Sequence, residues 1–93
     1  MLAGKDPHLR VVLIIFPSIF TGHRNGKVNI LNKNYKKINE IDLMKITSNK
    51  ALAPKVRSIC LNAQENRMLV GTFGSEIYEI KADTYPTHLA THH

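Results

Sequence analysis

A weak internal repeat with a spacing of 49 residues constrains the fold of this sequence more than any other feature. Gly71 falls on Gly22 at this spacing (71 − 22 = 49), and each glycine lies between an apolar pair and a polar turn that leads into an alternating strand. The apolar positions that coincide are Leu69 on Phe20, Ile77 on Val28 and Ile80 on Leu31. Self-similarity at a fixed period is typical of stacked supersecondary units. The repeat therefore predicts two copies of one small β-rich unit.

Length and composition limit the class of protein. These 93 residues can form at most one small domain with a thin core, so they do not make a large multi-domain enzyme. With 43% hydrophobic and 22% charged residues, the composition is that of a folded soluble protein, and we expect neither disorder nor a membrane partner. The single cysteine, Cys60, excludes an intramolecular disulfide scaffold and a cysteine zinc finger and favours a reducing compartment.

The N-terminal segment, residues 1–18, contains an apolar run at 11–16, VVLIIF. Two cations precede this run, as in a secretory signal, but the run is short, stops at Pro17 and has no small-residue cleavage site after it. Its length and its β-branched residues instead predict a strand that is covered on both faces.

The first repeat unit is expected at residues 11–43. Its predicted strands are 11–16, 19–21, 27–31 and 38–43, the last of which is ambiguous between strand and helix and is assigned as strand. Asn25 and Gly26 predict a tight hairpin turn because both residue types tolerate positive φ, and His23 is placed inside this turn. Residues 44–55 lack a sustained period and contain Pro54, so we expect a linker loop there.

The second unit is expected at residues 56–81, with strands at 56–61, 68–70 and 76–80. Polar residues at 62–67 and the Gly74 region at 73–75 supply its turns, and residues 82–93 form a tail without a convincing period. The predicted fold class is all-β, with each unit forming one small antiparallel sheet. Three or four short strands that pack against a neighbouring sheet have the layout of a propeller blade.

Residues 21–32, TGHRNGKVNILN, resemble the core pattern of WD40 repeats: Thr-Gly, a polar pair, Asp or Asn before Gly, an alternating strand, then Trp and Asp. Leu31 stands where Trp is usual, Asn32 replaces the Asp, and His23 is not the histidine of the family's Gly-His pair. The resemblance implies about two antiparallel blades of a WD40-type β-propeller, an incomplete ring, without the family's histidine–aspartate hydrogen-bond network.

Residues 56–61, VRSICL, and 67–80, RMLVGTFGSEIYEI, are similar to blades of the echinoderm microtubule-associated protein-like family. This resemblance implies a non-enzymatic protein-interaction scaffold in the cytoplasm and cytoskeleton, the ciliary axoneme included, with tubulin as partner. The family's upstream hydrophobic motif is not present, so an internal piece of a longer related chain is expected. Two blades leave sheet edges unpaired, and we expect an oligomer, a longer parent chain or a large assembly to hold them rather than a stable monomer.

The net charge of 13 − 7 = +6 favours an acidic partner. Five cations fall in residues 24–37, a window without an acid, and we predict that they form the docking face: Arg24, Lys27, Lys33, Lys36 and Lys37. A solvated edge of turns is the simpler interpretation. The alternatives for function are a generic WD40 scaffold fragment with another protein partner and a nucleic-acid-binding basic module, which is disfavoured because only Tyr35 could stack on a base.

Catalytic and metal chemistry find little support, and we predict no enzyme activity, no cofactor and no metal. Glu76 and Glu79 lie three residues apart in a predicted strand, so they should point to opposite faces. Cys60 is interpreted as a small buried side chain of the strand at 56–61. A possible ligand set in the tail is interpreted as polar sequence instead; its members are Asp83, His88, His92 and His93.

Overall fold

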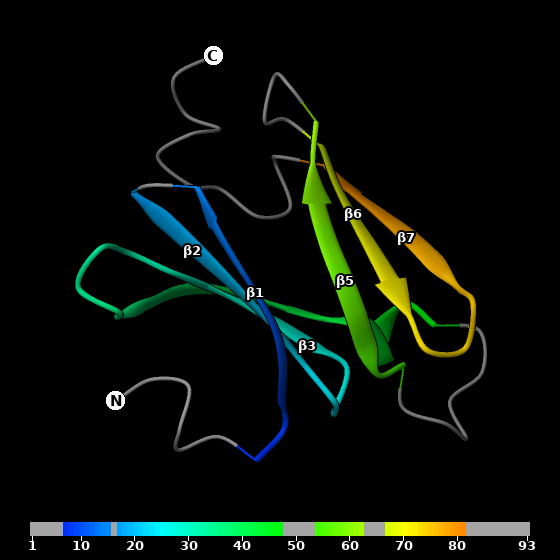
Figure 1. Ribbon diagram of the computed structural model, residues 1–93. Coiled ribbons are helices and arrows are strands. Elements are labelled where there is room, and N and C mark those ends of the chain that lie inside the picture. The colour runs from blue at the N-terminus through cyan, green and yellow to red at the C-terminus, as the bar shows by residue number, and fades with distance from the viewer. Residues whose placement is uncertain (1–6, 16, 48–53, 63–66, 82–93) are drawn as a thin grey trace.

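The computed structural model describes residues 7–15, 17–47, 54–62 and 67–81, and these form two antiparallel sheets (Figure 1). The first sheet has four strands in chain order: β1 (Leu9–Ile15), β2 (Ser18–His23), β3 (Lys27–Leu31) and β4 (Lys37–Asp42). The second has three, again in chain order: β5 (Val56–Leu61), β6 (Arg67–Thr72) and β7 (Ile77–Lys81). The all-β prediction and the division into two sheets are confirmed.

Most predicted strands lie within two residues of the observed ones. The predicted strand at 38–43 starts one residue earlier, at Lys37, and ends at Asp42. The side chain of Asp42 accepts a hydrogen bond from the Met44 backbone N–H at 3.0 Å. This contact caps one turn of 3-10 helix, η2 (Leu43–Lys45), which begins at the border of the expected linker. Phe16, residues 48–53 of the linker, residues 63–66 and the tail lie outside the described residues.

The repeat is carried by the backbone pairing itself. β2 maps onto β6 at the sequence spacing (67 − 18 = 49 and 72 − 23 = 49). In the first sheet Gly22 lies opposite Val11 and Val28, and in the second Gly71 lies opposite Ser58 and Ile77. Each first strand has a register shift just before this position, between Leu9 and Val11 and between Val56 and Ser58. The two sheets therefore share one pairing scheme, including its irregularity.

The turn after each glycine repeats as well. Gly26 N–H donates to His23 C=O at 3.1 Å, and Ser75 N–H donates to Thr72 C=O at 3.2 Å. Both turn-closing residues have positive φ, +87° at Gly26 and +65° at Ser75, and they are also 75 − 26 = 49 residues apart. Among the described residues Asn25 does not share this conformation, so only one residue of the predicted Asn-Gly pair uses the left-handed region.

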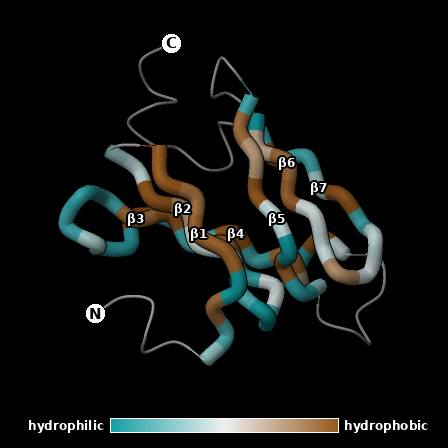
Figure 2. The backbone as a smooth tube through the Cα atoms, in the orientation of Figure 1, coloured by the Kyte–Doolittle hydropathy of each residue, from teal (hydrophilic) through white to brown (hydrophobic). Residues whose placement is uncertain are grey.

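The hydrophobic core lies between the two sheets. Its members from the first unit are Phe20, Val28, Ile30, Ile41 and Leu43. Those from the second unit are Val56, Ile59, Met68, Val70 and Ile80. β5 is the strand of the second sheet that contacts β1 and β2, and the hydropathy colouring shows apolar residues concentrated along these strands (Figure 2).

The prediction that the run at 11–16 is covered on both faces is wrong. β1 is an edge strand of the four-stranded sheet, and its residues alternate between partly buried and exposed. Val11 and Leu13 pack against the core, whereas Val12 is 41% and Ile14 is 65% exposed. The strand is apolar from Val11 onward, yet only one of its faces meets the second sheet, because successive side chains point to opposite faces.

Candidate protein-interaction site

The five cations of the predicted docking face do not form one cluster. Arg24 lies in the β2–β3 turn and Lys27 starts β3, whereas Lys33 and Lys36 lie in the β3–β4 turn and Lys37 starts β4. Successive hairpin turns of an antiparallel sheet lie at opposite ends of its strands. Arg24 is therefore separated by the length of β3 from Lys33, Lys36 and Lys37, and the predicted single face of five cations is corrected: Arg24 lies apart from these three lysines.

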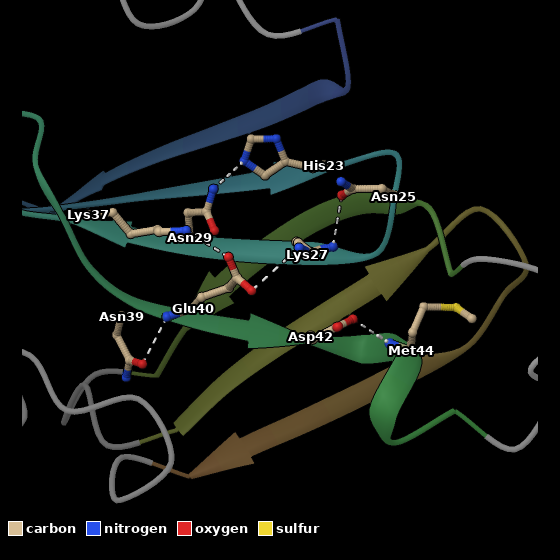
Figure 3. A network of polar contacts seen from close by, with 9 residues as sticks. All are labelled: His23, Asn25, Lys27, Asn29, Lys37, Asn39, Glu40, Asp42 and Met44. Carbon is tan, nitrogen blue, oxygen red and sulfur yellow. Dashed lines mark hydrogen bonds and ion pairs between the residues drawn. The ribbon is translucent and has the colours of Figure 1, made fainter.

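A carboxylate that lies outside the basic window joins two of these cations. Glu40 of β4 lies opposite Asn29 of β3, and its oxygens are 2.8 Å from Lys37 Nζ and 3.6 Å from Lys27 Nζ (Figure 3). The hydrogen bond from Lys37 and the positive charges of Lys37 and Lys27 lower the pKa of Glu40. The cluster of Lys27, Glu40 and Lys37 still carries one net positive charge, because two cations face one carboxylate.

The sequence-based prediction did not include Glu40, because the docking face was predicted from residues 24–37, a window without an acid. The signal that could have found it is the predicted pairing of the strand at 38–43 with the strand at 27–31, since cross-strand neighbours are distant in sequence but adjacent in space. Opposite charges on one sheet face are expected to pair in this way.

The β3–β4 turn presents the remaining lysines on an ordered backbone. Asn32 organises it: its carbonyl accepts from Tyr35 N–H at 2.9 Å, and its side-chain oxygen accepts from the backbone N–H groups of Asn34 and Lys36 at 2.9 and 3.0 Å. Within the described ranges, no carboxylate forms an ion pair with Lys33 or Lys36. We call Lys33, Tyr35 and Lys36, all exposed, the β3–β4 tip.

The side chain of His23 belongs to a buried polar group at the end of β2, which corrects its predicted position inside the turn; only its carbonyl takes part in the turn, by accepting from Gly26 N–H. It is the last residue of β2 and is buried. Its Nε2 lies 2.8 Å from Thr21 Oγ1 and 3.3 Å from Asn29 Nδ2, so the imidazole links β2 to β3 (Figure 3). Buried polar groups are costly unless they are hydrogen-bonded, and these contacts give the Nε2 atom of His23 two partners inside the first sheet.

The other candidate side chains have structural partners. Glu79 forms an ion pair with Arg67 at 2.7 Å, while Glu76 accepts a hydrogen bond from the Tyr78 hydroxyl at 2.9 Å. Burial raises the pKa of Tyr78. The two carboxylates therefore do not form an acid/base pair. Cys60 is exposed, contrary to the prediction, because Ile59 takes the inward position and its neighbour on β5 must point outward.

No group of three or more potential metal ligands occurs among the residues that the structure describes. Four residues of the tail that were considered as ligands lie outside those residues: Asp83, His88, His92 and His93. The described residues also contain no helix of the length and hydropathy needed to span a bilayer.

Comparison of the chain with protein-family models, with curated proteins and with solved structures finds no match.

Proposed function

We propose that this chain is a non-enzymatic protein-interaction scaffold, a WD40-like propeller fragment that binds an acidic protein surface. The observation that supports this most is the β3–β4 tip, where Lys33 and Lys36 project from an ordered turn without a carboxylate partner in the described part of the chain. The choice of tubulin as the acidic surface rests on the resemblance of residues 56–61 and 67–80 to microtubule-associated proteins.

The physical basis of the interaction is long-range attraction followed by weak contacts. An exposed ion pair contributes about 0.2 to 1 kcal/mol, so Lys33 and Lys36 together account for roughly one order of magnitude in affinity. The net charge of +6 adds attraction that acts over about 10 Å at 0.1 M salt. The Lys27–Glu40–Lys37 group adds one positive charge on the same sheet. Arg24 lies at the other end of β3 and is left out of the site.

Charge reversal at the tip tests this proposal. The variant Lys33→Glu/Lys36→Glu should weaken co-sedimentation with microtubules about tenfold at low salt. Its matched control is Lys55→Glu/Lys81→Glu, which changes one exposed lysine at the end of the linker and one at the end of the second unit and gives the same net charge, 6 − 4 = +2. Binding by the control should stay close to wild type.

Two results would contradict the proposed site. Equal losses in the two variants would mean that net charge alone drives binding. Unchanged binding in both would remove the β3–β4 tip from the interaction and favour a scaffold that meets another protein through other surfaces.

A single-stranded nucleic acid is the second candidate partner, because Tyr35 is 65% exposed between the two tip lysines. Stacking of a base on an aromatic ring contributes about 1 to 3 kcal/mol. Tyr35→Ser should therefore weaken binding to single-stranded RNA at least fivefold if RNA is the partner, and it should leave microtubule binding unchanged if the proposal is correct.

A further inference from the structure

The internal repeat relates the inner face of the first sheet, which packs in the core, to one face of the second sheet. The inner face of the first sheet carries Phe20, Gly22, Val28 and Ile30, which pack against the second sheet. Adding 49 to these numbers gives Leu69, Gly71, Ile77 and Glu79. These residues lie on the outer face of the second sheet, because Met68, Val70 and Tyr78 between them point inward. We call this surface the β5–β7 outer face.

The β5–β7 outer face has the apolar character of an interface but lies open. Leu69 is 47% and Ile77 is 74% exposed, although their equivalents Phe20 and Val28 are fully buried. A shallow depression of about 150 Å³ lies beside Leu69, lined by Cys60, Leu61, Asn62, Arg67 and Glu79. Leu69 and Ile77 therefore form a small exposed apolar surface beside a depression that the Arg67–Glu79 ion pair borders.

In the part of the chain that the structure describes, the backbone at Gly71 is also not covered by another sheet, unlike the backbone at Gly22. A Cβ atom on Gly22 would collide with Val56 of the second sheet, which packs directly on the glycine. A Cβ atom on Gly71 would meet only Ser58 Oγ, at 2.7 Å, a residue of its own sheet. Val56 of the other sheet therefore packs on the glycine of the first sheet, whereas no described residue of another sheet packs on the glycine of the second.

A surface that could pack on the β5–β7 outer face, in the way that β5 packs on the first sheet, lies at the other end of the molecule. Ile59 and Leu61 of β5 pack inward onto the first sheet. Their equivalents on β1, at a spacing of 47 residues because the β1–β2 connection is two residues shorter, are Val12 (59 − 47) and Ile14 (61 − 47). Both are exposed on the outer side of β1. Ile19, Thr21 and Leu31 lie on the same outer face as these two residues but are buried, so the exposed part of that face is the β1 side. The two-sheet stack therefore ends in two different apolar surfaces, the outer side of β1 and the β5–β7 outer face.

We propose that a second copy of this chain docks head to tail, placing the outer side of its β1, at Val12 and Ile14, on the β5–β7 outer face, at Leu69 and Ile77. The contact is heterologous, because the two surfaces belong to opposite ends of the molecule, and repetition would lead to a ring or an open chain of copies. The proposal depends on the strand registers and not on the acidic partner, since the β3–β4 tip is not part of either surface.

Two end-blocked variants of the full chain test the proposal in sedimentation velocity experiments. Leu69→Asp/Ile77→Asp blocks one surface, and Val12→Asp/Ile14→Asp blocks the other. Wild type should self-associate as its concentration rises, and each variant alone should stay monomeric. An equimolar mixture of the two variants should form a one-to-one dimer, because each variant retains the surface that its partner has lost.

The mixing experiment also identifies other arrangements. A Val12→Asp/Ile14→Asp variant that still dimerises alone would overturn the proposal in favour of a symmetric contact between two β5–β7 outer faces. A wild-type chain that stays monomeric at millimolar concentration, or variants that do not associate on mixing, would also overturn it. If an aspartate variant loses the β circular dichroism signal of the wild type, Leu69→Thr/Ile77→Thr and Val12→Thr/Ile14→Thr replace it, since threonine keeps strand propensity while removing apolar surface.

Discussion

The backbone of Gly22 lies directly against Val56, so closely that a Cβ atom on the glycine would overlap Cγ1 of the valine and lie 2.6 Å from Cγ1 of Val11. Val56 is fully buried and starts the strand of the second sheet that contacts β1 and β2. This glycine is therefore required by the close approach of the two sheets and not by a turn.

Gly22→Ala should destabilise the fold, because neither β-branched neighbour can move away without disturbing the packed core. Overpacking of this kind typically costs about 1 to 3 kcal/mol. The matched control is Gly71→Ala, where the added methyl meets only a serine hydroxyl that can rotate, and its cost should be below about 1 kcal/mol. Urea unfolding of the three proteins measures the difference. Equal free energies of unfolding for the two variants would show that the sheets do not meet at Gly22.

Tyr35→Gly should stabilise the protein. Tyr35 has a φ of +65° in the β3–β4 turn, and a side chain in the left-handed region costs about 1 to 2 kcal/mol. Glycine removes this strain but loses more conformational entropy on folding, because it makes the unfolded chain freer, so we expect a net gain of about 0.5 kcal/mol in the free energy of unfolding. Ser75→Gly, at the other non-glycine residue with positive φ among those described, should behave alike. A loss of stability in both variants would contradict these turn conformations.

Thr21→Val should weaken the first sheet, because it removes the hydroxyl that lies 2.8 Å from His23 Nε2 while keeping the shape of the side chain. Leaving a buried polar group without one of its partners costs about 1 to 3 kcal/mol. Ser58→Ala removes a hydroxyl from an exposed position on β5 and serves as the control. Thermal unfolding should show a lower melting temperature for Thr21→Val alone, and identical melting temperatures would rule out a stabilising role for the histidine contacts.

The ion pairs of Glu40 predict a pH dependence with a defined sign. The hydrogen bond from Lys37 lowers the pKa of Glu40 in the folded protein below the ordinary value of 4.5. The stabilisation is therefore complete above that value and is lost as pH falls towards the folded pKa. The group is partly exposed, so the effect stays below about 1 kcal/mol. Glu40→Gln should be less stable than wild type at pH 7, and the gap should narrow as the pH falls below 4.5 and through the folded pKa of Glu40. A gap that is constant over this range would contradict the assignment.

The sequence allowed the strand order to be predicted because alternating apolar residues and turn residues are local signals. The spacing between Gly22 and Gly71 extended this prediction to the second unit, and the strand registers follow it. The exposure of Cys60 and Ile14 could not be predicted, because it depends on which sheet face meets the other unit. The partner of Lys27 and Lys37 was missed for a similar reason, since Glu40 is adjacent to them only across paired strands.

The microtubule affinity of the wild-type chain as a function of salt tests the central claim, binding to an acidic surface, most directly. Co-sedimentation with microtubules and retention on single-stranded RNA should be measured in parallel at about 50 and about 200 mM salt, a range over which the Debye length falls roughly twofold. We expect microtubule binding at the lower concentration that weakens at least tenfold at the higher one, with weaker retention on RNA. Binding to RNA alone, or no microtubule binding at about 50 mM salt, would contradict it.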